Sequence, residues 1–277
     1  MNFQPVVPLP GLAGWTFLNR TLETQSESFA RSTPIRRDTD HFREVIASFT
    51  TAEALVEDRA ALRVALGAFG LQDDIDNRFF IRKVLEGGSQ DREALANRLA
   101  NKNYLALAEA FRFGPGEVPS TGLSVFAEDI VARFESRSFE IAVGERDTSF
   151  RLALNVRREL ADLAARDNAP KTLWLSVLGS PPLRQVFETT YGLPGAFAAF
   201  DLDRQVEILQ TRTAAAFGNA GVAQFADPDR MEELVRSFLL RSELQSGPPA
   251  NAPGMTALAL LQGTGQVTAG SILTALL

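Results

Sequence analysis

The sequence predicts an all-α fold, a bundle-like array of about ten helices joined by short connections. Apolar residues recur at the three- and four-residue spacing of a helix face through most of the 277 residues. The breaks between these stretches carry the Gly, Ser-Pro and Asp-Pro signals that end and start helices. One short stretch, SFEIAV, alternates enough for a strand, but both of its flanks have a helical pattern, so a helix is the preferred interpretation.

The amino-terminal part predicts an arm followed by a long helix. Residues 1–14 are rich in Pro and Gly and are expected to be irregular. From Trp15 onward the spacing becomes helical, with Phe17, Leu18, Leu22 and Phe29 near one side. Three later helix starts are predicted from N-cap signals: Thr50 with Glu53 as a capping box, Ser180 before Pro181, and Asp227 before Pro228.

Two similar stretches, VALGAFGL at 64–71 and VFETTYGL at 186–193, predict helix ends. In each, Gly70 or Gly192 is expected to be the left-handed residue after the last helical turn, with the following Leu folded back on that turn. The pairs Phe113-Gly114 and Phe217-Gly218 predict related ends. The alternative is an internal duplication, since DREAL at 91–95 loosely resembles DRMEEL at 229–234. Unequal offsets along the chain make a weak repeat the less favoured interpretation.

The predicted domain organisation has three parts. Residues 1–14 form the arm, residues 15–245 form a helical domain with two expected lobes at 15–118 and 119–245, and residues 246–277 form a Pro/Gly linker and an apolar tail. The tail has little charge, which leaves two interpretations open. It packs back onto the body, or it is held for a groove on a partner. Its candidate partner-binding residues are Leu258, Leu260, Leu261, Val267, Ile272, Leu273 and Leu276.

Composition narrows the classes of function. A net charge of −6 argues against general affinity for a phosphate backbone, so no nucleic-acid partner is expected. Cysteine is absent, which excludes disulfides, thiolate metal sites and a thiol nucleophile. No stretch approaches the roughly 20 apolar residues of a membrane span, and the amino terminus lacks the pattern of a secretory signal peptide. We therefore expect neither a membrane-spanning segment nor a secretory signal peptide.

Few residues suggest chemistry. The single histidine, His41, follows Asp40, but sequence places neither a nucleophile nor an orienting group beside it, so a surface or capping role is expected. The acidic residues Asp73, Asp74 and Asp76 do not match a calcium loop and are expected in a solvated helical turn. No catalytic residue, cofactor-binding residue, metal ligand or cofactor is predicted. We expect a protein that is not an enzyme.

Several stretches resemble the alphaproteobacterial family known as domain of unknown function 1217. They are LRVALGAFGLQDDI, FIRKVLE, ANRLANKNYLALAEAFRFG, VLGSPPLRQVFETTYGLP, DLDRQVEIL and FLLRSEL, and they span roughly residues 15–244. Members of this family are typically encoded near flagellar genes and often carry a flagellar-protein label. The resemblance implies a role in the bacterial flagellum or its assembly, with other flagellar proteins as partners and no enzymatic residues to transfer.

Three hypotheses of function follow. The leading one is a non-enzymatic flagellum-associated protein, a structural component or an assembly factor that acts in motility through protein–protein contacts. The second is a cytosolic chaperone or regulatory adaptor that binds a partner helix. A helical small-molecule enzyme is the third, and a deep pocket with converging polar groups around His41 or an arginine cluster would favour it.

Overall fold

The computed structural model describes residues 3–246, and these residues are helical with no strand. The all-α prediction is therefore confirmed, with SFEIAV inside a helix. The α-helices of this part of the chain are α1 (Gly11–Ala30), α2 (Thr33–Val45), α3 (Ala52–Glu57), α4 (Arg59–Phe69), α5 (Arg78–Gly87), α6 (Leu95–Arg98), α7 (Asn103–Phe111), α8 (Phe126–Gly144), α9 (Thr148–Ala164), α10 (Pro170–Gly179), α11 (Pro181–Tyr191), α12 (Leu202–Phe217) and α13 (Pro228–Ser246). Short 3-10 helices join them: η1 (Ile46–Ser48), η2 (Gln72–Asp74), η3 (Ser120–Gly122), η4 (Gly195–Ala199) and η5 (Val222–Ala226).

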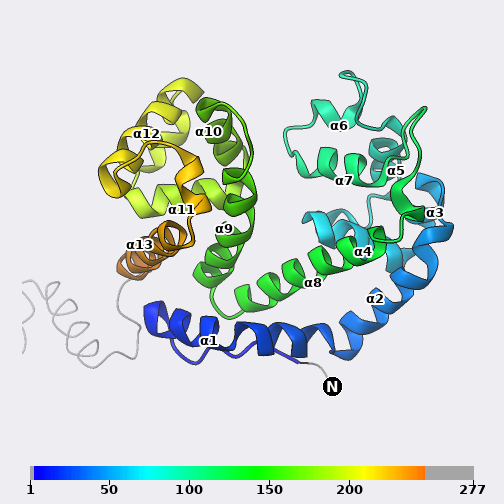
Figure 1. Cartoon of the computed structure of the whole chain (residues 1–277), viewed down its shortest axis with the longest axis horizontal. Helices are drawn as coiled ribbons and strands as arrows, with labels where there is room; N and C mark the ends of the chain where they lie inside the picture. Colours follow the sequence, from blue (N-terminus) through cyan, green and yellow to red (C-terminus); the bar gives the residue numbers. More distant parts are fainter. Residues whose placement is uncertain (1–2, 247–277) are drawn as a thin grey trace, which may run out of the picture.

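The helices form two groups linked along one side by α1, α2 and α8 (Figure 1). One group contains α3 to α7, and the other contains α9 to α13. Helix α1 begins at Gly11, inside the range that we expected to be an irregular arm. It packs against α8 and α13, so the start of the chain lies with its carboxyl-terminal group.

One hydrophobic cluster, which we call the tryptophan core, contains both tryptophans. Helix α1, the second half of α8, and α9 to α13 contribute to it. Trp174 contacts Phe187 edge to face with ring centroids 5.2 Å apart, and Phe187 in turn contacts Phe225 at 5.8 Å. The Trp174 indole N–H donates to the Ala220 carbonyl oxygen at 3.0 Å, which satisfies the polar atom of this buried ring.

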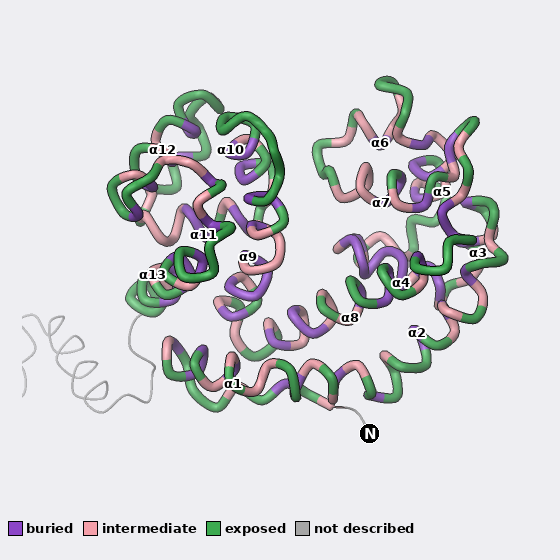
Figure 2. Tube along the Cα trace, in the orientation of Figure 1, coloured by how far each residue is buried: buried purple, intermediate pink, exposed green. Residues whose placement is uncertain are grey.

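The second cluster, which we call the α4 core, surrounds α4. Helices α2, α3, α5 and α7 and the first half of α8 contribute to it. Eight of the eleven α4 residues are buried, most of them small or aliphatic. The backbone of α4 approaches α8 closely, since a Cβ atom built on Gly67 would lie 2.6 Å from Cδ2 of Phe134. Figure 2 shows buried residues concentrated along α4 and α9, with the outer loops mostly exposed.

The two predicted helix ends have the expected geometry. Gly70 has φ +72° and Gly192 has φ +59°, both left-handed. The Leu71 N–H donates to the Leu66 carbonyl oxygen at 2.9 Å, and the Leu193 N–H donates to the Glu188 carbonyl oxygen at 2.9 Å. These are the six-to-one hydrogen bonds of a Schellman motif. The predictions at these two positions are confirmed.

Other local predictions had mixed outcomes. Helix α13 begins at Pro228, as predicted, and the Asp227 carboxylate accepts from the Asp229 N–H at 2.9 Å. The predicted capping box at Thr50 is wrong by one residue, because Thr51 is the extended residue whose hydroxyl accepts from the Ala54 N–H. The predicted helix end at Gly114 is also wrong, because α7 stops at Phe111 and Arg112 takes the left-handed conformation.

The two clusters meet on α8. Phe134 belongs to the α4 core and Phe139 to the tryptophan core. The division into two lobes, 15–118 and 119–245, stays a prediction. The two hydrophobic clusters divide the helices differently, because α1 packs with the carboxyl-terminal helices and α8 contributes to both clusters.

Candidate functional site

The tail residues proposed for partner binding lie outside the described residues 3–246. They are Leu258, Leu260, Leu261, Val267, Ile272, Leu273 and Leu276. The body therefore supplies the geometry on which a site can be built. Three features of the body bear on function: a polar cluster around His41, a groove beside α12, and a loop that exposes aliphatic side chains.

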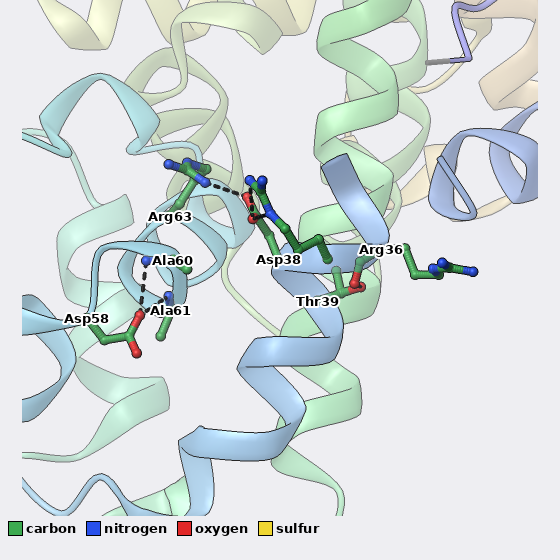
Figure 3. Close-up of polar contacts among 8 residues, drawn as sticks. Arg36, Asp38, Thr39, Asp58, Ala60, Ala61 and Arg63 are labelled. Atoms are coloured by element: carbon green, nitrogen blue, oxygen red, sulfur yellow. Dashed lines mark hydrogen bonds and ion pairs between the residues drawn. The ribbon is translucent and has the colours of Figure 1, made fainter. Parts of the chain in front are cut away.

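His41 pairs with a residue far from its sequence neighbour Asp40. The Nε2 atom of His41 lies 2.7 Å from Oδ2 of Asp58, the N-cap residue of α4. The other carboxylate oxygen of Asp58 accepts from the Ala60 and Ala61 N–H groups at 3.0 and 2.9 Å (Figure 3). Burial raises the pKa of Asp58, but the hydrogen bonds from Ala61 and His41 outweigh it and hold that pKa below its usual value. The carboxylate thus joins α2 to the start of α4.

A second carboxylate in the same region is buried. Asp38 of α2 accepts from Arg37 at 3.1 Å and from Nη1 of Arg63 of α4 at 2.5 Å (Figure 3). Both oxygens therefore have cationic partners, which compensates for their loss of water. The His41–Asp58 and Arg63–Asp38 contacts hold α2 against α4, and the remaining contacts lie within one helix or its cap. A fixed helix joint therefore accounts for the polar atoms of this cluster.

Two arginines lie on or near α8: Arg137 of α8 beside the end of α4, and Arg158 on α9. Arg137 lies beside the Schellman turn of α4, with its guanidinium Cζ 3.6 Å from the position of a Cβ atom on Gly70. Burial, with the nearby charge of Arg158, lowers the pKa of Arg137 to about 10. Arg158 itself makes a bidentate pair with the buried Glu140, at 2.7 and 3.0 Å. A cation beside the carboxyl end of α4 complements the helix dipole, so Arg137 has a structural role there.

Helix α12 and η4 border an open groove of about 370 Å³. Apolar side chains make up most of its lining: Leu193, Pro194, Phe197, Phe200 and Ile208. Arg204, Glu207, Thr211 and Arg212 complete it from α12. Arg204 and Glu207 are paired with each other at 2.6 Å. The groove can hold a few apolar side chains and has few polar groups to orient a small molecule.

The loop between α7 and α8 exposes three aliphatic residues. Val118 is 72% exposed, Leu123 is 60% exposed and Val125 is 62% exposed. The loop is nevertheless anchored, because buried Thr121 donates its hydroxyl to the Phe49 carbonyl oxygen at 2.7 Å. We call residues 118–125 the aliphatic loop. The loop presents exposed aliphatic side chains from an anchored backbone, which makes it a candidate surface for protein contacts.

Sequence reasoning missed both the groove and the aliphatic loop. The loop lies in a segment that we treated only as a helix break, and the groove depends on how residues 193–200 fold back beside α12. The signal available in the sequence is the aliphatic pair Leu123 and Val125 immediately before a helix start. In the described part of the chain, no three His, Cys, Asp or Glu side chains gather as a metal site would require. No helix of this part is long and apolar enough to span a membrane.

Comparisons with known proteins agree with the family and the fold. The family model described as "Protein of unknown function (DUF1217)" matches residues 68–231, more than half of the chain. A crystal structure of a protein from Agrobacterium tumefaciens is similar, with a TM-score of 0.71 and 24% sequence identity. The similarity covers 88% of this chain and 100% of that one, and at this identity it shows the fold alone. Among curated proteins, none matches the chain.

Proposed function

This chain belongs to the DUF1217 family of proteins of unknown function, and we propose that it is a non-enzymatic, flagellum-associated protein that acts by binding other proteins. The aliphatic loop is the observation that carries the binding part of this proposal. Three aliphatic side chains, each more than half exposed, lie within eight residues of an anchored loop. A loop whose backbone is already anchored loses less conformational entropy than a free loop when a partner covers its side chains.

The flagellar part of the proposal has a separate basis. It comes from the family resemblance, because members of this family are typically encoded near flagellar genes. The partners would be other flagellar proteins, and the candidate contacts are the aliphatic loop and the apolar residues of the tail. Whether the protein is a structural component or an assembly factor depends on where it resides.

Deletion of the gene in a flagellated host tests the proposal. We expect the deletion strain to lose swimming motility or assembled filaments, and the wild-type gene to restore both. Normal swimming and normal filaments in the deletion strain would refute the flagellar role. Purified basal bodies and culture supernatant that contain the protein would support a structural component, whereas a wholly cytosolic protein would favour the adaptor hypothesis.

Complementation tests the aliphatic loop. A Leu123→Asp, Val125→Asp double variant should restore swimming poorly, because a charge at either position opposes apolar contact. Ser124→Asp is the control, since it adds a charge to an exposed residue between them and removes no aliphatic surface. A Leu123→Ser, Val125→Ser variant, which removes the aliphatic surface without adding charge, should also restore swimming poorly. Full restoration by either double variant, with protein levels equal to those of the control, would show that the loop is not the contact surface.

A further inference from the structure

The groove beside α12 leaves apolar surface in water. Phe200 on its lining is 46% exposed, and the adjacent Leu202 at the start of α12 is 57% exposed. Ile208 and Leu193 are only partly buried, although both pack against the tryptophan core. An apolar ligand that covers these side chains would be stabilised because it removes apolar surface from water. The groove therefore favours an apolar occupant.

We propose that residues 255–261 of this same chain, MTALALL, dock in the groove beside α12. The segment carries no ionisable side chain, and neither does any other residue from 247 to 277. Met255, Leu258 and Leu261 recur every three residues, a spacing that places them along one side of a helical turn. A neutral apolar segment fits a groove whose lining is mostly apolar and in which Arg204 and Glu207 neutralise each other, leaving Arg212 as the one other charged residue of the described lining.

The groove lies close to the point where this segment leaves the body. A Cβ atom on Gly192 would lie 3.2 Å from the guanidinium Cζ of Arg241 on α13. Leu193 and Pro194 follow Gly192 directly and form one end of the groove. From Arg241 to the end of α13 at Ser246 is five residues, about 8 Å along a helix axis. Residues 247–254 can span at most about 29 Å when extended, so the segment can reach the lining of the groove from its own end of the chain.

The amino-terminal arm shows that this body already holds a terminal segment in a similar way. The Val6 N–H donates to Oε1 of Gln25 at 2.7 Å, and Nε2 of Gln25 donates to the Val6 carbonyl oxygen at 3.1 Å. Phe3 and Val7 pack against the tryptophan core. Docking of residues 255–261 would cover a second face of the same core. Val267, Ile272, Leu273 and Leu276 lie beyond the docked segment and would remain for partner proteins.

Cross-linking in the 277-residue chain tests the proposal. Because the chain has no cysteine, two introduced cysteines are the only thiols that can react. One cysteine replaces Thr211, an exposed residue of the groove lining, and the other replaces Gln262, next to the docked segment. The matched control keeps Gln262→Cys and places the first cysteine at Ser124, an exposed residue before α8. A short bismaleimide should cross-link the Thr211→Cys pair within one molecule at least about tenfold faster than the control pair, because docking raises the effective concentration of the two thiols.

A third variant shows whether the groove itself causes the effect. Adding Phe200→Asp to the Thr211→Cys pair should reduce the cross-linking rate to that of the Ser124→Cys control, with circular dichroism confirming unchanged helix content. Equal rates for the two original pairs would overturn the proposal. Cross-links found only between two molecules, with rates that rise with protein concentration, would also overturn it and assign the groove to the tail of a second copy. Neither result bears on the flagellar role, which the gene deletion tests independently.

Discussion

The tryptophan core and the α4 core are both built from packed helices, but they fill space in different ways. In the tryptophan core, large rings lie between helices, with Trp174 against Phe187 and Phe187 against Phe225. In the α4 core, one helix is buried almost all round, and small residues such as Gly67 allow its neighbours to approach. The first core should therefore be most sensitive to the loss of volume, and the second to its addition.

The largest expected effect is a cavity in the tryptophan core. Trp174→Ala should lower the free energy of unfolding by about 3–5 kcal/mol, because it removes a fully buried ring and leaves the Ala220 carbonyl oxygen without its indole donor. Urea unfolding followed by circular dichroism measures the change. Leu244→Ala, at a residue that is 75% exposed, is the control and should change stability by less than about 0.5 kcal/mol. A similar small change for Trp174→Ala would mean that the rings do not support this core.

Added volume in the α4 core should change the free energy of unfolding by less, and the sign of that change distinguishes helix propensity from steric clash. Helix propensity alone predicts that Gly67→Ala stabilises by about 1 kcal/mol. The new methyl group would instead press on the Phe134 ring, so we expect a net loss of about 1–3 kcal/mol in unfolding experiments.

Two variants separate this clash from other effects of the change at Gly67. Phe134→Leu in the Gly67→Ala background should recover part of the loss, because it frees space at the contact. Gly179→Ala at the end of α10, where nothing lies within 4 Å of the new methyl group, should not destabilise. If Gly67→Ala were stabilising, the close approach of α4 and α8 would not limit the packing of this core.

The smallest expected effect concerns the cap of α4. The pKa of Asp58 is lowered in the folded state, so its contribution to stability is present above the unfolded pKa of about 3.9 and is lost as the pH falls through the folded value. Asp58→Asn keeps a good N-cap but removes the charge that faces His41. The stability difference between wild type and variant, at most about 1 kcal/mol at pH 6, should therefore shrink between pH 5 and pH 3.

A matched cap in the other core isolates the contribution of His41. Asp147 caps α9 by accepting from the Ser149 and Phe150 N–H groups, so Asp147→Asn reports what an acidic cap contributes in the tryptophan core. Denaturation at pH 6, 4 and 3 gives both comparisons. If the difference in unfolding free energy between wild type and Asp58→Asn stayed constant from pH 6 to pH 3, the charged form of Asp58 would not be stabilised by folding.

Features encoded within a few residues were the most predictable from the sequence. Gly70 and Gly192 were recognised as helix ends because a left-handed residue strongly favours glycine. The same preference for glycine led to the wrong prediction that a helix ends at Gly114. The left-handed residue there is Arg112, two residues earlier in the chain. At Thr50 and Thr51 two neighbouring hydroxyl residues could each cap the helix, and only the backbone conformation distinguishes them.

Contacts between distant residues were not predictable in this way. His41 reaches Asp58 across 17 residues, and Trp15 reaches Glu232 across 217. Helical periodicity says which face of a helix is buried, but it does not say which helix covers it. The groove beside α12 and the shared position of α8 both depend on that pairing, so neither could be derived from the chain alone.

The shared helix α8 limits how the chain length can vary. Phe134 and Phe139 are five residues apart, so they project about 140° apart around the helix axis, each toward its own core. One inserted or deleted residue between them would turn one half of α8 by about 100° relative to the other and withdraw a phenylalanine from its core. Insertions and deletions should therefore be absent from this stretch in related chains.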